Sequence, residues 1–133
     1  MVLVLQWLHV LFGIFWFGSQ MYLDSSVRPA IALLPVDGQA IMGRGLGQGM
    51  ARRITVVTST GTVLFGILRG IVGGVLDTLD TAYGRTWLAA LAIGVFMVLS
   101  IYTRGYGGRI KPLLWNGLFV VMFTLMIAMR FGY

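Results

Sequence analysis

Four long apolar runs divide the chain, and each has about the length that a helix needs to cross a bilayer. They cover residues 2–23, 54–76, 86–103 and 113–132. A hydrocarbon core about 30 Å thick is crossed by roughly 20 helical residues. The pattern therefore predicts an all-α fold, a polytopic membrane protein with a four-transmembrane-helix bundle, in which residues 1–133 form a single integral membrane domain.

Residues 24–53 form the long connection, which joins the first two runs. We expect a short interfacial helix after Pro29. The segment GRGLGQG at residues 43–49 has the glycine content of a phosphate-binding loop, but no strand precedes it and no Lys-Ser/Thr pair follows it. We therefore interpret it as a flexible connection.

The basic residues predict the orientation of the chain in the membrane. Four spans put both termini on one side, so the first and third connections share the other side. Those two connections carry Arg28, Arg44, Arg52, Arg53, Arg104, Arg109 and Lys111. Basic residues accumulate on the cytoplasmic side. We expect an integral protein of the bacterial cytoplasmic membrane, with the connection between helices 1 and 2 on the cytoplasmic side and both termini outside the cytoplasm.

The amino-acid composition excludes several classes of function. Hydrophobic residues make up 58% of the chain and charged residues 11%, whereas a soluble domain carries about 25% charged residues. A net charge of +6 in such a chain reflects orientation, so we expect no nucleic-acid partner. Without cysteine, disulfides and thiolate metal sites are excluded. The chain has one histidine.

Polar and small residues recur with helical spacing in the first two runs, which predicts the faces that point into the bundle. The two faces consist of Gln6, His9, Gly13, Trp16 and Gln20, and of Thr55, Thr58, Thr62, Phe65 and Arg69. A further ridge of Gly66, Gly70 and Gly74 permits close approach of a second helix, either within the bundle or in a dimer.

One histidine, one arginine and one methionine are expected at the same depth. His9 and Arg69 each lie seven residues from the end of their run on the side of the termini, which is about 10 Å. Met126 in the last run comes to roughly the same level. An arginine at this depth needs a partner, either Asp77 or Asp80, reached by snorkelling, or an anionic ligand such as a haem propionate. Two roles are open for His9. It either makes a hydrogen bond across helices to Gln6 or a threonine, or has a functional role as a ligand.

Two segments resemble a known family. These are LHVLFGIFWFGSQMYLDSSVRPAI at residues 8–31 and TAYGRTWLAALAIGVFMVLSIYTRGYGGRIKP at residues 81–112. The first has a His followed by an aromatic residue, a Gly and an Arg-Pro pair, and it resembles the first helix of the copper resistance D (CopD)-like superfamily of four-helix membrane proteins. That superfamily is distantly similar to HemJ-type protoporphyrinogen oxidase, which is thought to hold b-type haem through the first-helix His. The resemblance carries His9 over as the ligand.

The resemblance implies a protein that binds haem b or a metal ion, such as copper, in haem or copper handling or electron transfer. We expect His9 as the axial or metal ligand, Arg69 at a haem propionate, Trp16 as a wall of the pocket and Met126 as the second ligand. Haem is favoured over copper because Arg69 would repel Cu(I). No catalytic residue is assigned. Similar proteins carry a third-helix Lys, absent from residues 88–91 here, which disfavours protoporphyrinogen oxidation.

An alternative stays open in which the chain carries no cofactor. It would be a noncatalytic accessory transmembrane subunit of a larger respiratory or photosynthetic membrane complex, and His9 and Arg69 would make only helix-to-helix hydrogen bonds. The expected partners are the lipid bilayer and either a second copy of the chain or a larger complex. A homodimer is required for bis-His ligation because each chain has a single histidine.

Overall fold

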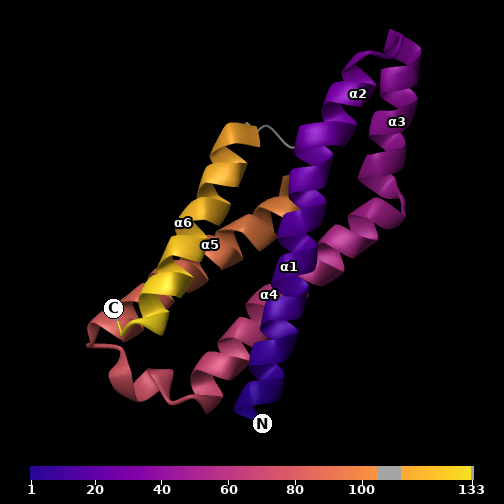
Figure 1. Ribbon diagram of the computed structural model, residues 1–133. Helices are drawn as coiled ribbons and strands as arrows, with labels where there is room; N and C mark the ends of the chain where they lie inside the picture. Colours follow the sequence, from indigo (N-terminus) through magenta and orange to yellow (C-terminus); the bar gives the residue numbers. More distant parts are fainter. Residues whose placement is uncertain (105–111, 133) are drawn as a thin grey trace.

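The computed structural model describes residues 1–104 and 112–132, and within these ranges the chain is helical and has no strand (Figure 1). The long helices are α1 (Val2–Tyr22), α4 (Met50–Val72), α5 (Ala82–Arg104) and α6 (Pro112–Arg130). Among the described residues, four helical segments are long and apolar enough to span a membrane. The all-helical fold with four such helices agrees with the hydropathy pattern.

The first helix is longer than the predicted run of residues 2–23. A π-helical turn, η1 (Leu23–Val27), joins α1 to α2 (Arg28–Ala32), so the helical segment continues to Ala32. The N–H of Arg28 donates to the carbonyl of Leu23. Pro29 has no N–H, and its ring clashes with the carbonyl four residues earlier in a regular α-helix. The wider turn just before Pro29 accommodates this ring, and the helix continues past the end of the apolar run.

The glycine-rich connection is helical, which corrects the prediction of a flexible segment at residues 43–49. Helix α3 (Val36–Gln48) includes Gly43, Gly45 and Gly47, and a break at Gly49 separates it from α4. Glycine lowers helix propensity but does not forbid a helix. Helix α3 also contacts both α2 and α4, and such packing overrides a weak local preference. Pro29 itself lies in α2, which continues the first helix, and the helix that follows it is α3; α2 and α3 form a helical hairpin.

Helix α4 differs from the predicted range of 54–76 at both ends. It begins at Met50 and ends at Val72, where Gly74 adopts a left-handed conformation with φ 81°. Only glycine takes such a conformation at low cost. A short 3₁₀ helix, η2 (Val75–Thr78), follows. The hydroxyl of Thr81 then accepts a hydrogen bond from the N–H of Gly84 at 3.2 Å and caps the start of α5.

The long helices pack mainly in the order of the chain, because α4 contacts both α1 and α5, and α5 contacts α6. Helix α1 also meets α6, where Phe17 stacks edge-on against Phe119 and Phe123 at centroid distances of 5.2 and 4.9 Å. A buried cluster lies between these helices and consists of Trp16, Met97, Ile101, Trp115, Phe119 and Met122. The N-terminus of α1 and the C-terminal end of α6 lie at the same end of the bundle (Figure 1).

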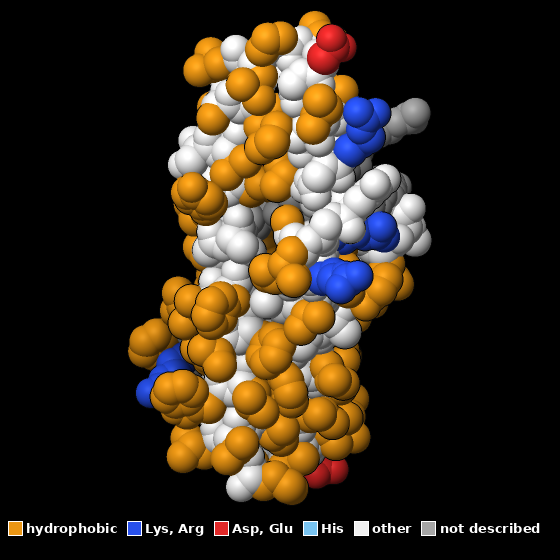
Figure 2. All heavy atoms as spheres, turned by 90° about the vertical axis from the view of Figure 1, so that its right-hand side faces the viewer, with side chains coloured by type: hydrophobic (Ala, Val, Ile, Leu, Met, Phe, Trp, Pro, Cys, Tyr) orange, Lys and Arg blue, Asp and Glu red, His pale blue; other side chains and the backbone are white. Residues whose placement is uncertain are grey.

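The surface is apolar over the long helices and basic near the α2–α3 hairpin. Figure 2 shows one face of the molecule, on which apolar side chains cover most of the lower half. Lys and Arg side chains are visible there mainly in the upper and middle parts, and an acidic side chain lies among apolar ones at the upper tip. Exposed apolar side chains on α1 include Leu3, Trp7 and Ile14. A surface of this kind is stable in contact with lipid rather than with water.

Candidate functional site

The candidate site lies where the N-terminal half of α1, the C-terminal half of α4 and the start of α5 meet, in the lower part of Figure 1. The two predicted inward faces pack against each other along α1 and α4. Trp16, Gln20, Thr55, Thr58 and Thr62 are buried, and His9, Gly13, Phe65 and Arg69 are half-buried. The buried threonine hydroxyls donate to backbone carbonyls one turn earlier in α4. These hydroxyls therefore add no charge to the interface.

The His9 imidazole is fixed by one hydrogen bond to the neighbouring helix. Its Nδ1 lies 2.7 Å from the backbone oxygen of Thr62. A carbonyl oxygen only accepts hydrogen bonds, so Nδ1 carries the hydrogen. In the neutral imidazole the lone pair is then on Nε2. The hydrogen bonds of the described residues leave Nε2 without a partner. Metal-ligating histidines are commonly oriented in this way, by an Nδ1–H bond to a carbonyl.

Glycine makes room for this imidazole. A Cβ atom added at Gly66 would lie 2.9 Å from both Cε1 and Nδ1 of His9. One turn further along α4, a Cβ atom at Gly70 would lie 2.6 Å from Nε1 of Trp87 on α5. The glycine ridge was expected to pack either within the bundle or in a dimer. Gly66 and Gly70 pack within the bundle. Gly74 instead forms the turn after α4.

Arg69 follows Gly66 by one turn of α4, and its charge has no acidic partner among the described residues. Its Nη1 donates to the hydroxyl of Tyr83 on α5 at 2.7 Å. Its Nε is buried without a hydrogen-bond partner. The ion pair seen in the described part of the chain joins Asp24 to Arg28, and both Asp77 and Asp80 are exposed. Arg69 is therefore not paired with Asp77 or Asp80, the two acidic residues that snorkelling would have reached.

The structure brings two of the four predicted site residues together. His9 contacts α4 at Thr62 and packs against Gly66, which lies one turn before Arg69, so His9 and Arg69 lie on neighbouring turns of the α1–α4 pair. Trp16 is fully buried in the core cluster, edge-on to Phe119 at 5.0 Å, about 10 Å along α1 from His9. Met126 is half-buried on α6, and no hydrogen bond or aromatic contact joins it to the other three.

Tyr83 is the residue of this region that the sequence pattern does not reveal. It lies just before the third apolar run, where an aromatic side chain is typical of the membrane interface. Its hydroxyl meets Arg69 because the turn at Gly74 and the η2 helix bring the start of α5 back beside the end of α4. The Tyr-Gly-Arg sequence at residues 83–85 is the signal that could have drawn attention to it.

A separate polar group lies at the other end of α1. The Asp24 carboxylate is 3.0 Å from Nη1 of Arg28 and is only 6% exposed. The buried Gln20 side chain donates to the same carboxylate at 3.4 Å. Both charges are compensated within this group, so it offers no unpaired charge to a ligand.

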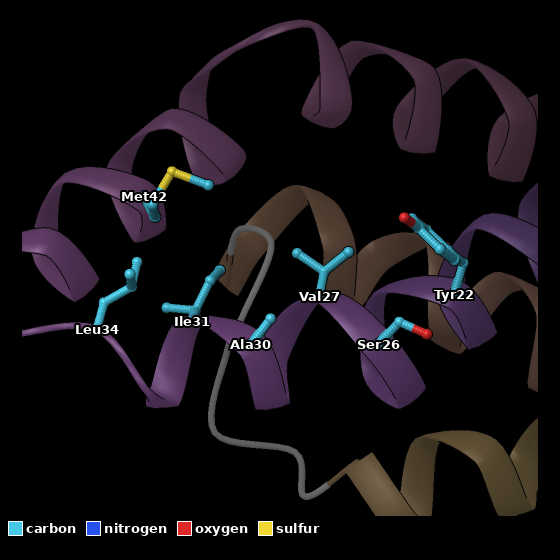
Figure 3. Close-up of a pocket in the computed structure, with 7 residues that line it drawn as sticks. All are labelled: Tyr22, Ser26, Val27, Ala30, Ile31, Leu34 and Met42. Atoms are coloured by element: carbon cyan, nitrogen blue, oxygen red, sulfur yellow. The ribbon is translucent and has the colours of Figure 1, made fainter.

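A groove of about 300 Å³ runs between the α1–α2 segment and α3 (Figure 3). Its lining consists of Tyr22, Ser26, Val27, Ala30, Ile31, Leu34 and Met42. The lining is mainly apolar and carries no charged side chain. It lies at the α2–α3 hairpin, away from His9 and Arg69.

In the described part of the chain, no three His, Asp or Glu side chains gather closely enough to hold a metal ion. Family models, curated proteins and solved structures gave no match to this chain.

Proposed function

We propose that this chain is a membrane protein that binds haem b through His9, with Arg69 beside a haem propionate. The observation that carries the proposal is the hydrogen bond from Nδ1 of His9 to the Thr62 carbonyl, which leaves the Nε2 lone pair for a ligand bond. On the next turn, the Arg69 guanidinium adds a charge that has no acidic partner in the described part of the chain. A propionate carboxylate complements that charge.

Haem suits a site with one histidine better than a bare metal ion does. The porphyrin supplies four nitrogen ligands to iron, so a single protein ligand is sufficient. A copper site would need Met126 or a second chain in addition to His9, and the Arg69 charge opposes a cation. Bound haem would supply a one-electron iron couple for electron transfer. The protein would supply the axial nitrogen from His9, the charge from Arg69 and an apolar surround that excludes water.

The absorption spectrum of the purified protein tests this proposal. We expect a Soret band and reducible α and β bands in the wild type, and their loss in His9→Ala. Gln6→Ala is the matched control, because Gln6 lies one turn away on the same half-buried face and should leave the spectrum unchanged. Added imidazole should restore the bands in His9→Gly by replacing the missing ligand. Unchanged haem content in His9→Ala would exclude His9 as the ligand.

A second candidate is the noncatalytic accessory subunit of a larger membrane complex. It is favoured by the packing of the imidazole against Gly66 and by the bond from Arg69 to Tyr83, since both are contacts between helices. This alternative predicts a colourless, metal-free protein. His9→Ala would then lower thermal stability or detach the chain from its complex, without any spectral change.

A further inference from the structure

Arg69 and Tyr83 together carry several hydrogen-bond donors. A guanidinium has five N–H donors, and Nη1 of Arg69 donates to the Tyr83 hydroxyl at 2.7 Å. Nε is buried and unpartnered, so the edge formed by Nε and Nη2 keeps its pair of parallel donors. This edge is the one that binds a carboxylate or a phosphate in a bidentate manner.

Tyr83 contributes a further donor beside that edge. Because its oxygen accepts the hydrogen bond from Arg69, its own O–H hydrogen is left to donate, and no acceptor for it occurs among the described hydrogen bonds. Tyr83 is half-buried at the start of α5. The phenol therefore both orients the guanidinium and adds an O–H donor next to it.

The neighbouring cation is already satisfied, which sets Arg69 apart. Arg85 lies on the same turn of α5 as Tyr83, and its Nε and Nη2 donate to the backbone oxygen of Asp80 at 3.2 and 2.8 Å. Arg85 is exposed, whereas Arg69 is half-buried with an orphaned Nε. A half-buried, uncompensated cation among apolar helices costs free energy unless an anion accompanies it.

We propose that Arg69 and Tyr83 form a binding site for one oxyanion, a carboxylate or phosphate, at the end of the bundle where α1 begins. The proposal rests on the proposed function in one respect, which is that a haem propionate is a source of that oxyanion. The phosphate of a phospholipid headgroup is the other source. Tyr83 is thereby a ligand-binding residue in its own right, in addition to positioning Arg69.

A comparison of haem with its dimethyl ester measures how much the carboxylates contribute to the affinity. Haem and its dimethyl ester are titrated into the purified apoprotein in detergent, and the two affinities are compared. The ester keeps the iron and the ring but has no carboxylate. We expect the wild type to bind haem about tenfold more tightly than the ester, since a hydrogen bond to a charged group contributes on that order. Arg69→Gln and Tyr83→Phe should each reduce this preference, whereas His9→Ala should weaken both ligands alike.

Retention of phospholipid tests whether a headgroup phosphate is the oxyanion. This test does not require that the protein binds haem. The protein is purified with native lipid, and bound phosphorus is measured per chain. If phosphate is the ligand, Arg69→Gln and Tyr83→Phe should lose bound phospholipid even when the wild type contains no haem. Arg69→Lys should retain part of it, because an ammonium keeps the charge but not the bidentate fork.

Two variants serve as controls in both assays. Tyr102→Phe removes a phenol on the same helix whose oxygen lies 3.1 Å from the Thr60 hydroxyl, and Arg85→Gln removes the neighbouring exposed cation. Both should behave as the wild type does. If Arg69→Gln and Tyr83→Phe change neither the preference for haem over its ester nor the bound phosphorus, the oxyanion site is excluded. If the wild type binds no haem but its bound phosphorus still falls in Arg69→Gln, only the haem proposal is overturned.

Discussion

At the scale of single residues, glycine decides how closely α1 approaches α4 at the candidate site. A Cβ atom at Gly66 would lie 2.9 Å from the His9 ring, and one at Gly61 would overlap the ring of Phe12. Contacts this short require a neighbour to move. The hydrogen bond from His9 to the Thr62 carbonyl, which leaves Nε2 free, therefore depends on the absence of a methyl group one turn further along α4.

Gly66→Ala should displace the imidazole and weaken its bond to Thr62. Introducing a methyl group into a packed interface costs about 1–3 kcal/mol. We expect a lower thermal unfolding temperature in detergent and, where haem is bound, a weaker or shifted Soret band. Thermal melts followed by circular dichroism and absorption spectra measure both effects.

Gly18→Ala is the control for this substitution, because Gly18 is exposed on the same helix as His9 and a Cβ atom there meets nothing within 4 Å. It should match or exceed the stability of the wild type, since alanine is the better helix former. Equal melting temperatures and equal spectra for Gly66→Ala and the wild type would show that the close contact at His9 does not constrain the site.

At the scale of elements, helix α3 is helical in spite of its glycines. Cβ atoms at Gly43 and Gly47 would meet nothing within 4 Å, so alanine at these positions gains helix propensity without a clash. Each Gly→Ala change contributes up to about 1 kcal/mol. Gly43→Ala and Gly47→Ala should therefore each slow amide hydrogen exchange in Val36–Gln48 by about fivefold.

Gly61→Ala provides the contrast. It makes the same change in helix propensity, but the added methyl group clashes with the Phe12 ring. It should speed exchange in α1 and α4 or lower the melting temperature. If exchange in Val36–Gln48 is as fast in the Gly43→Ala and Gly47→Ala variants as in the wild type, local helix propensity does not limit the stability of α3.

The positions of the long helices were predictable from sequence, but their ends were not. Hydropathy identifies runs of about 20 apolar residues, and a helix continues wherever its backbone hydrogen bonds can be completed. In α1 and α2 the ion pair between Asp24 and Arg28 and the π-helical turn before Pro29 carry the helix past the apolar run. At the other boundary, α4 begins at Met50, before Arg52 and Arg53, because arginine is a good helix former.

The candidate site was predictable where it depends on helical periodicity. Steps of three and four residues place His9 and Arg69 on facing sides of α1 and α4, and their similar depth follows from the helix rise. Periodicity contains no information on how α1 crosses α6 or on where a turn returns the chain. Those two features put Trp16 into the core beside Phe119 and bring Tyr83 to Arg69.

At the scale of the whole molecule, charge is distributed unequally between the two ends. The end with the α2–α3 hairpin and the start of α4 carries four arginines, Arg28, Arg44, Arg52 and Arg53, against Asp24 and Asp37. The end with the chain termini carries Arg85 and Arg130 against Asp77 and Asp80. Basic residues near membrane-spanning segments are retained on the cytoplasmic side. From this asymmetry we expect the hairpin and its groove on the cytoplasmic side and His9 near the opposite surface.

The absence of cysteine in the sequence allows this topology to be tested by labelling. Leu33→Cys in the hairpin and Leu76→Cys in the η2 turn form a matched pair, since both leucines are exposed, by 87% and 56%. A maleimide that cannot cross membranes should label Leu76→Cys in intact cells, and Leu33→Cys only after the cells are permeabilised. Terminal reporters that are active only in the cytoplasm should stay silent. The reverse labelling pattern would place the termini, and with them His9 and Arg69, near the cytoplasmic surface, so that any oxyanion bound there would come from the cytoplasmic leaflet.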